Sequence, residues 1–137
     1  MLHRLAISLV LACAASEALA CRGTFSESTI VFDEAPTSMD VPVIAEVTIT
    51  DMSETIESST GLPIAVMNAR IERVIRGLID NKDLKIVTHL SDCSRIGIGR
   101  GIVAGSLRSD PQQGVELVAV QESNAERAIR KARERSK

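Results

Sequence analysis

Aromatic residues are the clearest shortage in this sequence, which has no Trp, no Tyr and only two Phe among 137 residues. Proteins that bind single strands of nucleic acid stack the bases on aromatic side chains, and Phe25 and Phe32 alone offer little for this. Nucleic-acid binding also needs a basic surface. The net charge is −2, and residues 21–57 contain eight acidic residues and one basic residue. We therefore expect no nucleic-acid partner.

Histidine is nearly as scarce, with only His3 and His89. His3 lies in the N-terminal leader described below, so the mature chain has His89 alone, which excludes a multi-His zinc site and weakens a Ser-His-Asp proposal. His89 and Cys93 would meet on a helix and could form a reactive pair. On a strand, the same four-residue spacing separates them by about 13 Å. We expect no enzymatic activity.

Two short motifs resemble binding loops without having their chemistry. The Gly97–Gly101 segment lacks the Lys-Ser/Thr of a phosphate-binding loop and the spacing of a dinucleotide site. The acidic Asp80–Asp83 segment lacks the Gly and the distal Glu of an EF-hand. We predict no cofactor and no metal site.

The N-terminal segment has the features of an export signal. A cationic start at Met1–Arg4 precedes an apolar run from Leu5 to Ala15, and Ala18–Ala20 has the small-x-small pattern of a cleavage site. The run is too short to cross a bilayer, which needs about 20 residues. The alternative is an N-terminal core helix. We expect residues 1–20 to be a signal peptide, and the mature protein to be periplasmic or secreted.

Cleavage after Ala20 would make Cys21 the first mature residue, as in bacterial lipoproteins. The usual Leu of the lipidation motif is replaced by Ala18, and Glu17 precedes it. We expect membrane association only if Cys21 is lipidated. Cys13 leaves with the leader, so Cys21 and Cys93 are the two mature cysteines, an even number in an oxidising compartment.

Alternation of apolar and polar residues predicts a mainly β domain. The pattern is cleanest from Val43 to Ile49, which reads as a strand with one buried face, and Thr29–Phe32 reads as a partial strand. Residues 51–63 read as a long polar loop. Three further strands are predicted at Leu84–Leu90, Ile102–Leu107 and Val115–Val120. The segments Asp80–Asp83 and Ser109–Gly114 read as turns, and Gly97–Gly101 as a tight turn into a strand that passes close to a neighbour.

The run from Ala65 to Ile79 has two interpretations. Apolar residues at spacings of three and four suit a helix. Alternation that slips at Glu72–Arg73, as at a bulge, suits a bent strand, and it places Gly77 in a turn. We favour the strand because its neighbours are strands. The charged tail, residues 121–137, has too little apolar area to offset ordering, which predicts a frayed helix or disorder.

Taken together, these segments resemble the netrin-like (NTR) domain family, which includes the tissue inhibitors of metalloproteinases. The matching segments are Cys21, Val43–Ile49, Arg73–Gly77, Leu84–Cys93, Gly99–Ala104 and Val115–Val120. The resemblance implies a five-stranded closed barrel of OB type over residues 21–120 with a flanking C-terminal helix. It also implies a disulfide that ties Cys21 to the barrel through Cys93. The chain departs from the family in having only two mature cysteines and few aromatics.

The resemblance also suggests a function. We expect a non-enzymatic, monomeric exported binding module with an unknown protein partner, inhibitory by analogy with the family. In the metalloproteinase inhibitors the N-terminal Cys chelates the target's zinc, so Cys21 and its neighbour Arg22 are possible interaction residues. Arg22 and Gly23 depart from the inhibitors' pattern, which has a small or apolar residue and a second Cys there. The alternative is a small envelope-anchored, lipoprotein-like structural protein.

We predict that Cys21 and Cys93 form a disulfide in the exported protein. In the chain-entropy model, closing the loop from residue 21 to residue 93 with a disulfide stabilises the fold by roughly 4 kcal/mol. Thiol labelling of the unfolded, unreduced mature protein should find no free thiol. Two labelled cysteines per chain would refute the pairing.

Overall fold

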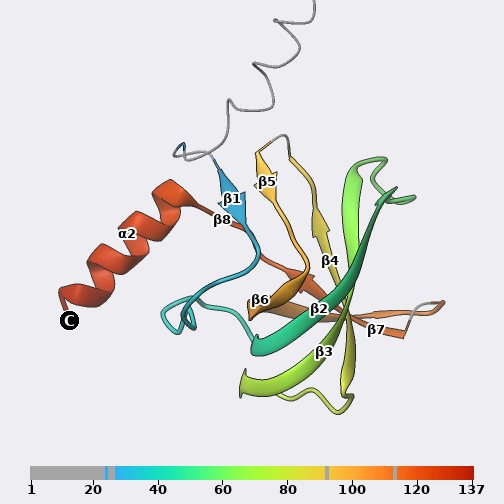
Figure 1. The fold of residues 1–137 in the computed structure, drawn as a ribbon, viewed down its shortest axis with the longest axis horizontal. Helices are drawn as coiled ribbons and strands as arrows, with labels where there is room; N and C mark the ends of the chain where they lie inside the picture. The colour runs from blue at the N-terminus through green and yellow to red at the C-terminus, as the bar shows by residue number, and fades with distance from the viewer. Residues whose placement is uncertain (1–23, 25–26, 92, 113) are drawn as a thin grey trace, which may run out of the picture.

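The computed structural model describes residue 24 and residues 27–91, 93–112 and 114–137. Five strands form a closed barrel, and three very short strands and one helix lie beside it (Figure 1). The barrel strands are β2 (Val43–Ile56), β3 (Pro63–Arg76), β4 (Asp83–His89), β6 (Gly99–Asp110) and β7 (Gly114–Ala119). The short strands are β1 (Ser28–Thr29), β5 (Ser94–Arg95) and β8 (Glu122–Ser123), and the helix is α2 (Asn124–Arg135).

The strand order around the barrel is β2-β3-β4-β7-β6, and β6 returns to pair with β2. Every neighbouring pair is antiparallel except β4 and β7, which run parallel over Lys85–Val87 and Glu116–Val118. This arrangement is consistent with an OB-type fold. The predicted fold class, a mainly β five-stranded barrel with a C-terminal helix, is confirmed.

The barrel interior is filled by aliphatic side chains from alternate positions of each strand. Val43, Ala45, Val47 and Ile49 of β2 all point inward and are almost completely buried. Opposite them, the neighbouring strands supply Met67, Ile86, Val103 and Leu117, each fully buried. Alanines lie between these larger residues and leave room for them in the narrow interior. Phe32 is also buried, but it packs in a separate cluster with Ile44 and Ala104.

The run from Ala65 to Arg76 is a strand, so the helical interpretation was wrong. Ile71 pairs with Val47 while Arg73 pairs with Glu46, which leaves Glu72 as an extra residue in β3. The bulge that the alternation predicted at Glu72–Arg73 is therefore present. Bulges bend a strand and increase its twist, which helps β2 and β3 to curve around the barrel.

The predicted polar loop at residues 51–63 is wrong. β2 continues to Ile56, and only residues 57–62 connect it to β3. An extra residue at Thr50 shifts the register, and beyond it the residues of β2 are exposed on both faces. This part of β2 lies beyond its pairing with β6, while β3 opposite it still pairs with β4 and buries Ala65 and Met67. The side chains of β2 are therefore exposed here, and neither face of β2 needs to be apolar. A strand without a buried face has no alternation to reveal it.

A second, three-stranded sheet lies beside the barrel, in the order β5-β1-β8. Gln121 joins it to the barrel. Its side-chain oxygen accepts hydrogen bonds from Ser28 Oγ at 2.9 Å and Ser94 Oγ at 2.8 Å. Its amide donates to Thr88 Oγ1 at 3.0 Å and to the backbone oxygen of His89. One side chain thus ties β1 and β5 to the end of β4.

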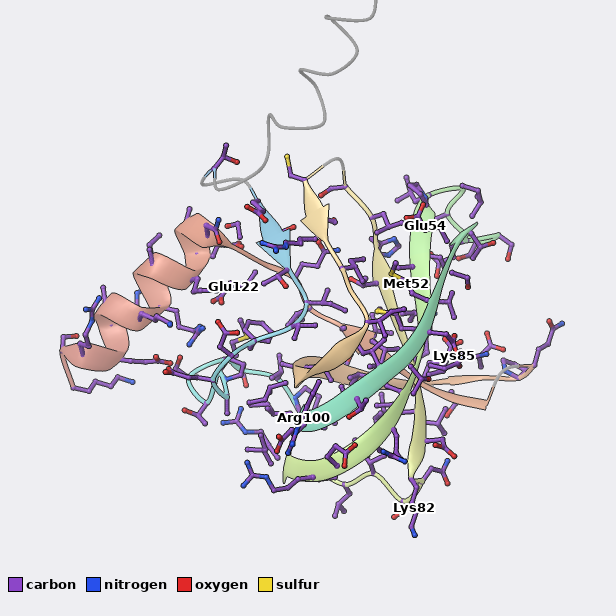
Figure 2. The ribbon with its side chains drawn as sticks, viewed as in Figure 1. Met52, Glu54, Lys82, Lys85, Arg100 and Glu122 are labelled. Carbon is purple, nitrogen blue, oxygen red and sulfur yellow. The ribbon has the colours of Figure 1, made fainter. Side chains whose placement is uncertain are left out.

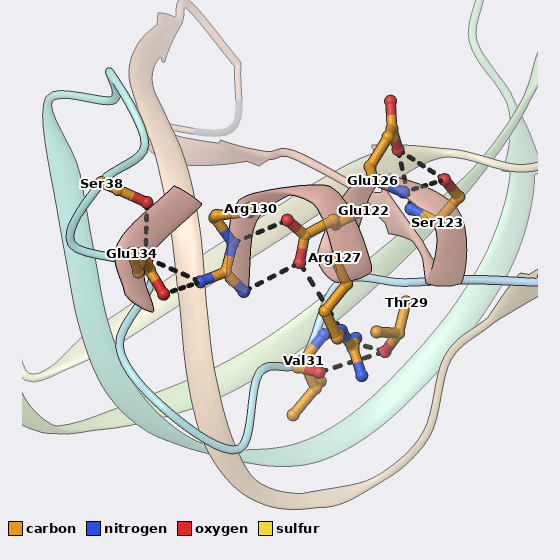
Figure 3. Close-up of polar contacts among 9 residues, drawn as sticks. All are labelled: Thr29, Val31, Ser38, Glu122, Ser123, Glu126, Arg127, Arg130 and Glu134. Atoms are coloured by element: carbon orange, nitrogen blue, oxygen red, sulfur yellow. Dashed lines mark hydrogen bonds and ion pairs between the residues drawn. The ribbon is translucent and has the colours of Figure 1, made fainter. Parts of the chain in front are cut away.

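Residues 124–135 form helix α2, so of the two alternatives for the tail, a helix or disorder, the helix is confirmed. Ser123 and Glu126 form a capping box at its start, and hydrogen bonds from Ser123 lower the pKa of Glu126. The carboxylate of Glu122 is 3% exposed, accepts two hydrogen bonds from Arg130 at 2.7 and 3.0 Å, and lies 3.5 Å from Arg127 (Figure 3). A cap and a buried ion pair, rather than apolar area, hold this helix. No described helix is long and apolar enough to cross a bilayer.

Glycines occupy the points where the backbone turns or strands come closest. Gly77 has φ +86° in the turn after β3, as predicted. A Cβ on Gly101 would lie 2.1 Å from Cγ1 of Val31, which confirms the expected close approach. A Cβ on Gly105 would lie 2.1 Å from the backbone oxygen of Val118 in β7, where little movement is possible.

We predict that Gly105→Ala destabilises the barrel by about 1–3 kcal/mol or more, because the new methyl group forces β6 and β7 apart. Gly97→Ala is the matched control, since nothing lies within 4 Å of its Cβ position. It should change stability by at most about 0.5 kcal/mol. Urea unfolding measures both, and equal stability of the two variants would contradict the close packing of β6 on β7.

Candidate functional site

A groove of about 480 Å³ lies on the outer surface of the barrel. Two hairpins, β2–β3 and β6–β7, project from the barrel on the same side and bound this groove (Figure 1). We call it the hairpin groove. Its lining includes Ser53, Thr55, Val66, Val87, Arg108 and Glu116.

The floor of the hairpin groove consists of outward-pointing residues of adjacent strands. Side chains alternate between the two faces of a strand, so the residues next to the inward-facing Met67 and Ile86 point outward. Val66 of β3 and Lys85 and Val87 of β4 line the floor (Lys85 is labelled in Figure 2). Apolar and polar groups alternate across this surface; Val66 and Lys85 are partly exposed, whereas Val87 is buried.

An ion-pair network crosses the hairpin groove from one hairpin to the other. Arg108 of β6 contacts Glu116 Oε2 of β7 at 3.0 Å and Glu57 Oε1 at 3.3 Å, at the tip of the β2–β3 hairpin. The second oxygen of Glu57 accepts a hydrogen bond from Thr60 Oγ1 at 2.9 Å and lies 4.0 Å from His89 Nε2. Glu116 is 4% exposed, so Arg108 supplies the charge partner that a buried carboxylate requires. Arg108 therefore fixes the distance between the two hairpins.

The electrostatics of this network keep Glu57 and Arg108 charged. The hydrogen bond from Thr60 lowers the pKa of Glu57; partial burial opposes this, and Arg108 and His89 lower the pKa further. The hydrogen bond to Glu116 raises the pKa of Arg108. A general base works best with a pKa near the operating pH. Here the pKa of Glu57 is lowered, away from neutral pH, so its carboxyl group stays ionised and pairs with Arg108.

A larger hollow of about 570 Å³ lies between α2 and the residues before β2. Met39 and Ile129 contribute apolar surface to it. Glu134 accepts hydrogen bonds from Ser38 Oγ at 2.5 Å and Arg130 at 3.1 Å, and the bond from Ser38 is the main cause of its lowered pKa. Because these contacts hold the helix to the barrel, we consider the hairpin groove the stronger candidate.

The predicted site residues Cys21 and Arg22 lie outside the described residues. Cys93 lies between β4 and β5. The disulfide between Cys21 and Cys93 therefore stays a prediction. Among the described residues, no three His, Cys, Asp or Glu side chains are grouped as they would be around a metal ion.

The residues of the hairpin groove were not predicted from the sequence. Glu57, Arg108 and Glu116 come from three separate segments and form no local motif. The hairpin loop at Ser109–Gly114 was predicted, but its position opposite residues 57–62 follows only from the barrel topology. Topology was therefore the one signal that could have located the groove.

The arrangement of strands and helix defines the protein as a five-stranded closed β-barrel with a C-terminal helix, consistent with an OB-type fold. No protein-family model matches the chain, and no curated protein or solved structure does so either. The class of the fold is therefore assigned from its geometry, without a family.

We predict that Thr60→Ala raises the pKa of Glu57, because it removes the main hydrogen bond that stabilises the carboxylate. A group with a lowered folded pKa stabilises the fold above its unfolded pKa, and this contribution is lost as the pH falls through the folded value. The hairpin of the variant should therefore show less stabilisation from Glu57 at neutral pH. NMR titration of the Glu57 carboxyl measures the shift.

Thr50→Ala is the matched control, since Thr50 Oγ1 donates to the backbone oxygen of Asn68 and not to Glu57. This variant should leave the pKa of Glu57 unchanged. An unshifted Glu57 in Thr60→Ala would contradict the hydrogen-bond assignment.

Proposed function

We propose that the chain is a non-enzymatic exported module that binds a protein partner through the hairpin groove. The observation that supports this most directly is the network of Glu57, Arg108 and Glu116, which holds charges of both signs in fixed positions between two hairpins. Fixed, complementary charges favour recognition of a specific surface. The outer face of an OB-type barrel, with its flanking loops, is also a common ligand surface.

The chemistry of the hairpin groove favours a polypeptide as the ligand. Ser53, Thr55 and Gln112 provide hydroxyl and amide groups beside the apolar floor. These groups suit the backbone and mixed side chains of a protein loop. No described groove residue is aromatic, so rings of sugars or bases have no stacking surface there. The volume, about 480 Å³, lies within the range of pockets that enclose small ligands or a few side chains.

Export and inhibition are further parts of this proposal. Residues 1–20 have the pattern of a signal peptide, which supports a periplasmic or secreted location. Inhibition of a metalloprotease would require Cys21 and Arg22, both outside the described residues. Binding through the hairpin groove does not require them, so the two surfaces are separable by mutation. A lipid on the processed Cys21 would favour the envelope-anchored alternative.

We predict that a photo-crosslinking amino acid at Gln112, in the hairpin groove, captures one predominant partner when the exported protein is produced in its own cells. Lys82 is the matched control position, because it is exposed on the turn before β4, away from the groove (Figure 2). Mass spectrometry identifies the adduct, and the substitution Arg108→Ala should reduce its yield. The same adducts from both positions, or no effect of Arg108→Ala, would argue against the groove as the binding surface.

A further inference from the structure

Part of strand β2 has an open edge. β2 pairs with β6 only from Val43 to Ile49, opposite Gly105 to Gly99. β6 begins at Gly99, where φ is +130° and the preceding chain turns away from β2. From residue 51 to residue 56, β3 is the only strand paired with β2 among the described residues. The other edge of β2 is unpaired over six residues.

The register of the hairpin identifies the backbone groups on this edge. The N–H of Glu57 donates to the backbone oxygen of Leu62 at 2.9 Å. In an antiparallel pair, hydrogen-bonded and non-hydrogen-bonded positions alternate. Residues 52, 54 and 56 therefore occupy the non-hydrogen-bonded positions, and their N–H and C=O groups point away from β3. Pro63 opposite Ile56 agrees with this, since Pro has no N–H to donate.

The side chains beside this edge form an alternating pattern. Met52 is 37% exposed, Glu54 is exposed, and Ile56 is 62% exposed. All three lie on the face of the hairpin that continues from the barrel interior, because they pair with Met67, Ala65 and Pro63. Glu54 has no hydrogen bond or ion pair with any described residue. Figure 2 labels Met52 and Glu54 on the part of β2 that approaches the β2–β3 turn.

We propose that the edge of β2 from Asp51 to Ile56 binds an extended polypeptide segment, which adds to it as an antiparallel strand. The outward N–H and C=O groups of residues 52, 54 and 56 provide the hydrogen bonds. Residues directly opposite each other on neighbouring strands interact strongly. The preferred segment therefore has a Lys or Arg opposite Glu54, with apolar residues two positions away on either side, opposite Met52 and Ile56.

A second copy of the chain fits this edge poorly. Antiparallel pairing of two identical edges about a two-fold axis places Glu54 opposite Glu54, Met52 or Ile56 of the copy. The first arrangement opposes like charges, which is destabilising. The other two place a charge against an apolar side chain and leave it unpaired. The chemistry of the edge thus favours a different chain with a basic residue.

This site overlaps the hairpin groove only at its end. Ser53 and Thr55 point to the opposite face of β2 and line the groove, whereas Met52 and Glu54 lie on the other face and do not line it. Ile56, the last residue of the edge, also borders the groove. Binding at the edge does not require the network around Arg108. The two sites can be tested separately.

The test uses blocked seven-residue peptides in which Val and Thr alternate around a central residue. The peptide with a central Lys should bind about fivefold more tightly than the one with a central Glu, in a titration followed by NMR. Glu54→Lys should reverse this preference. Methylation of the peptide nitrogens that face β2 should abolish binding, and hydrogen exchange at the amides of residues 52, 54 and 56 should slow when the peptide binds.

Asp51→Lys makes the same charge change on the opposite face and is the matched control. The Asp51→Lys variant should still bind the peptide with a central Lys more tightly than the peptide with a central Glu. Salt screens charges separated by about 10 Å, so the new Lys at position 51 should have little effect on the central residue of the peptide. Equal binding of the two peptides, binding that survives methylation, or no binding would overturn the proposal. So would a dimer, detected by sedimentation, whose formation depends on the same edge.

Discussion

The extra residues in β2 and β3 are the constraint on which the rest of the structure depends. A five-stranded barrel is narrow, and its strands must bend sharply to close. Glu72 and Ile75 are inserted in β3 and Thr50 in β2, where each shifts the register between the two strands. The first two lie where β3 curves around the barrel, and Thr50 lies next to the last pair of β2 with β6. Bulges thus help to close the barrel, and the one at Thr50 also marks the point at which β2 separates from β6.

Both candidate binding surfaces, the hairpin groove and the open edge of β2, depend on this separation of β2 from β6. The hairpin curves over one side of the barrel and places Glu57 within 3.3 Å of Arg108, which creates the hairpin groove. On its other side the hairpin has lost β6 as a neighbour and has an open edge. An open edge normally invites aggregation, and a charged residue such as Glu54 in its centre limits indiscriminate pairing. Glu54 disfavours strands that place an acidic or apolar residue opposite it, and it favours strands that place a Lys or Arg there.

Segments that bury an apolar face could be predicted from the sequence. Segments without a buried apolar face could not be predicted. Val43–Ile49 alternates because one face is inside the barrel, and the slip at Glu72 is visible because the alternation resumes after it. Residues 51–56 are solvent-exposed on both faces, so their strand left no pattern. Helix α2 was underestimated because its docking depends on Glu122, a single buried carboxylate, and not on an apolar stripe. The hairpin groove combines distant segments, which only the strand order brings together.

The position of β1 has a consequence for the order in which the chain acquires its structure. Ser28 lies between Ser94 on one side and Ser123 on the other, so one of the first described strands is completed by one of the last. During synthesis, residues 28–29 remain without either neighbour until most of the chain has been made. Contacts between such distant positions are slow to form, because a long loop must close first. The sheet β5-β1-β8 is therefore a late structure, and a chain that stops before residue 122 leaves β1 with only one partner.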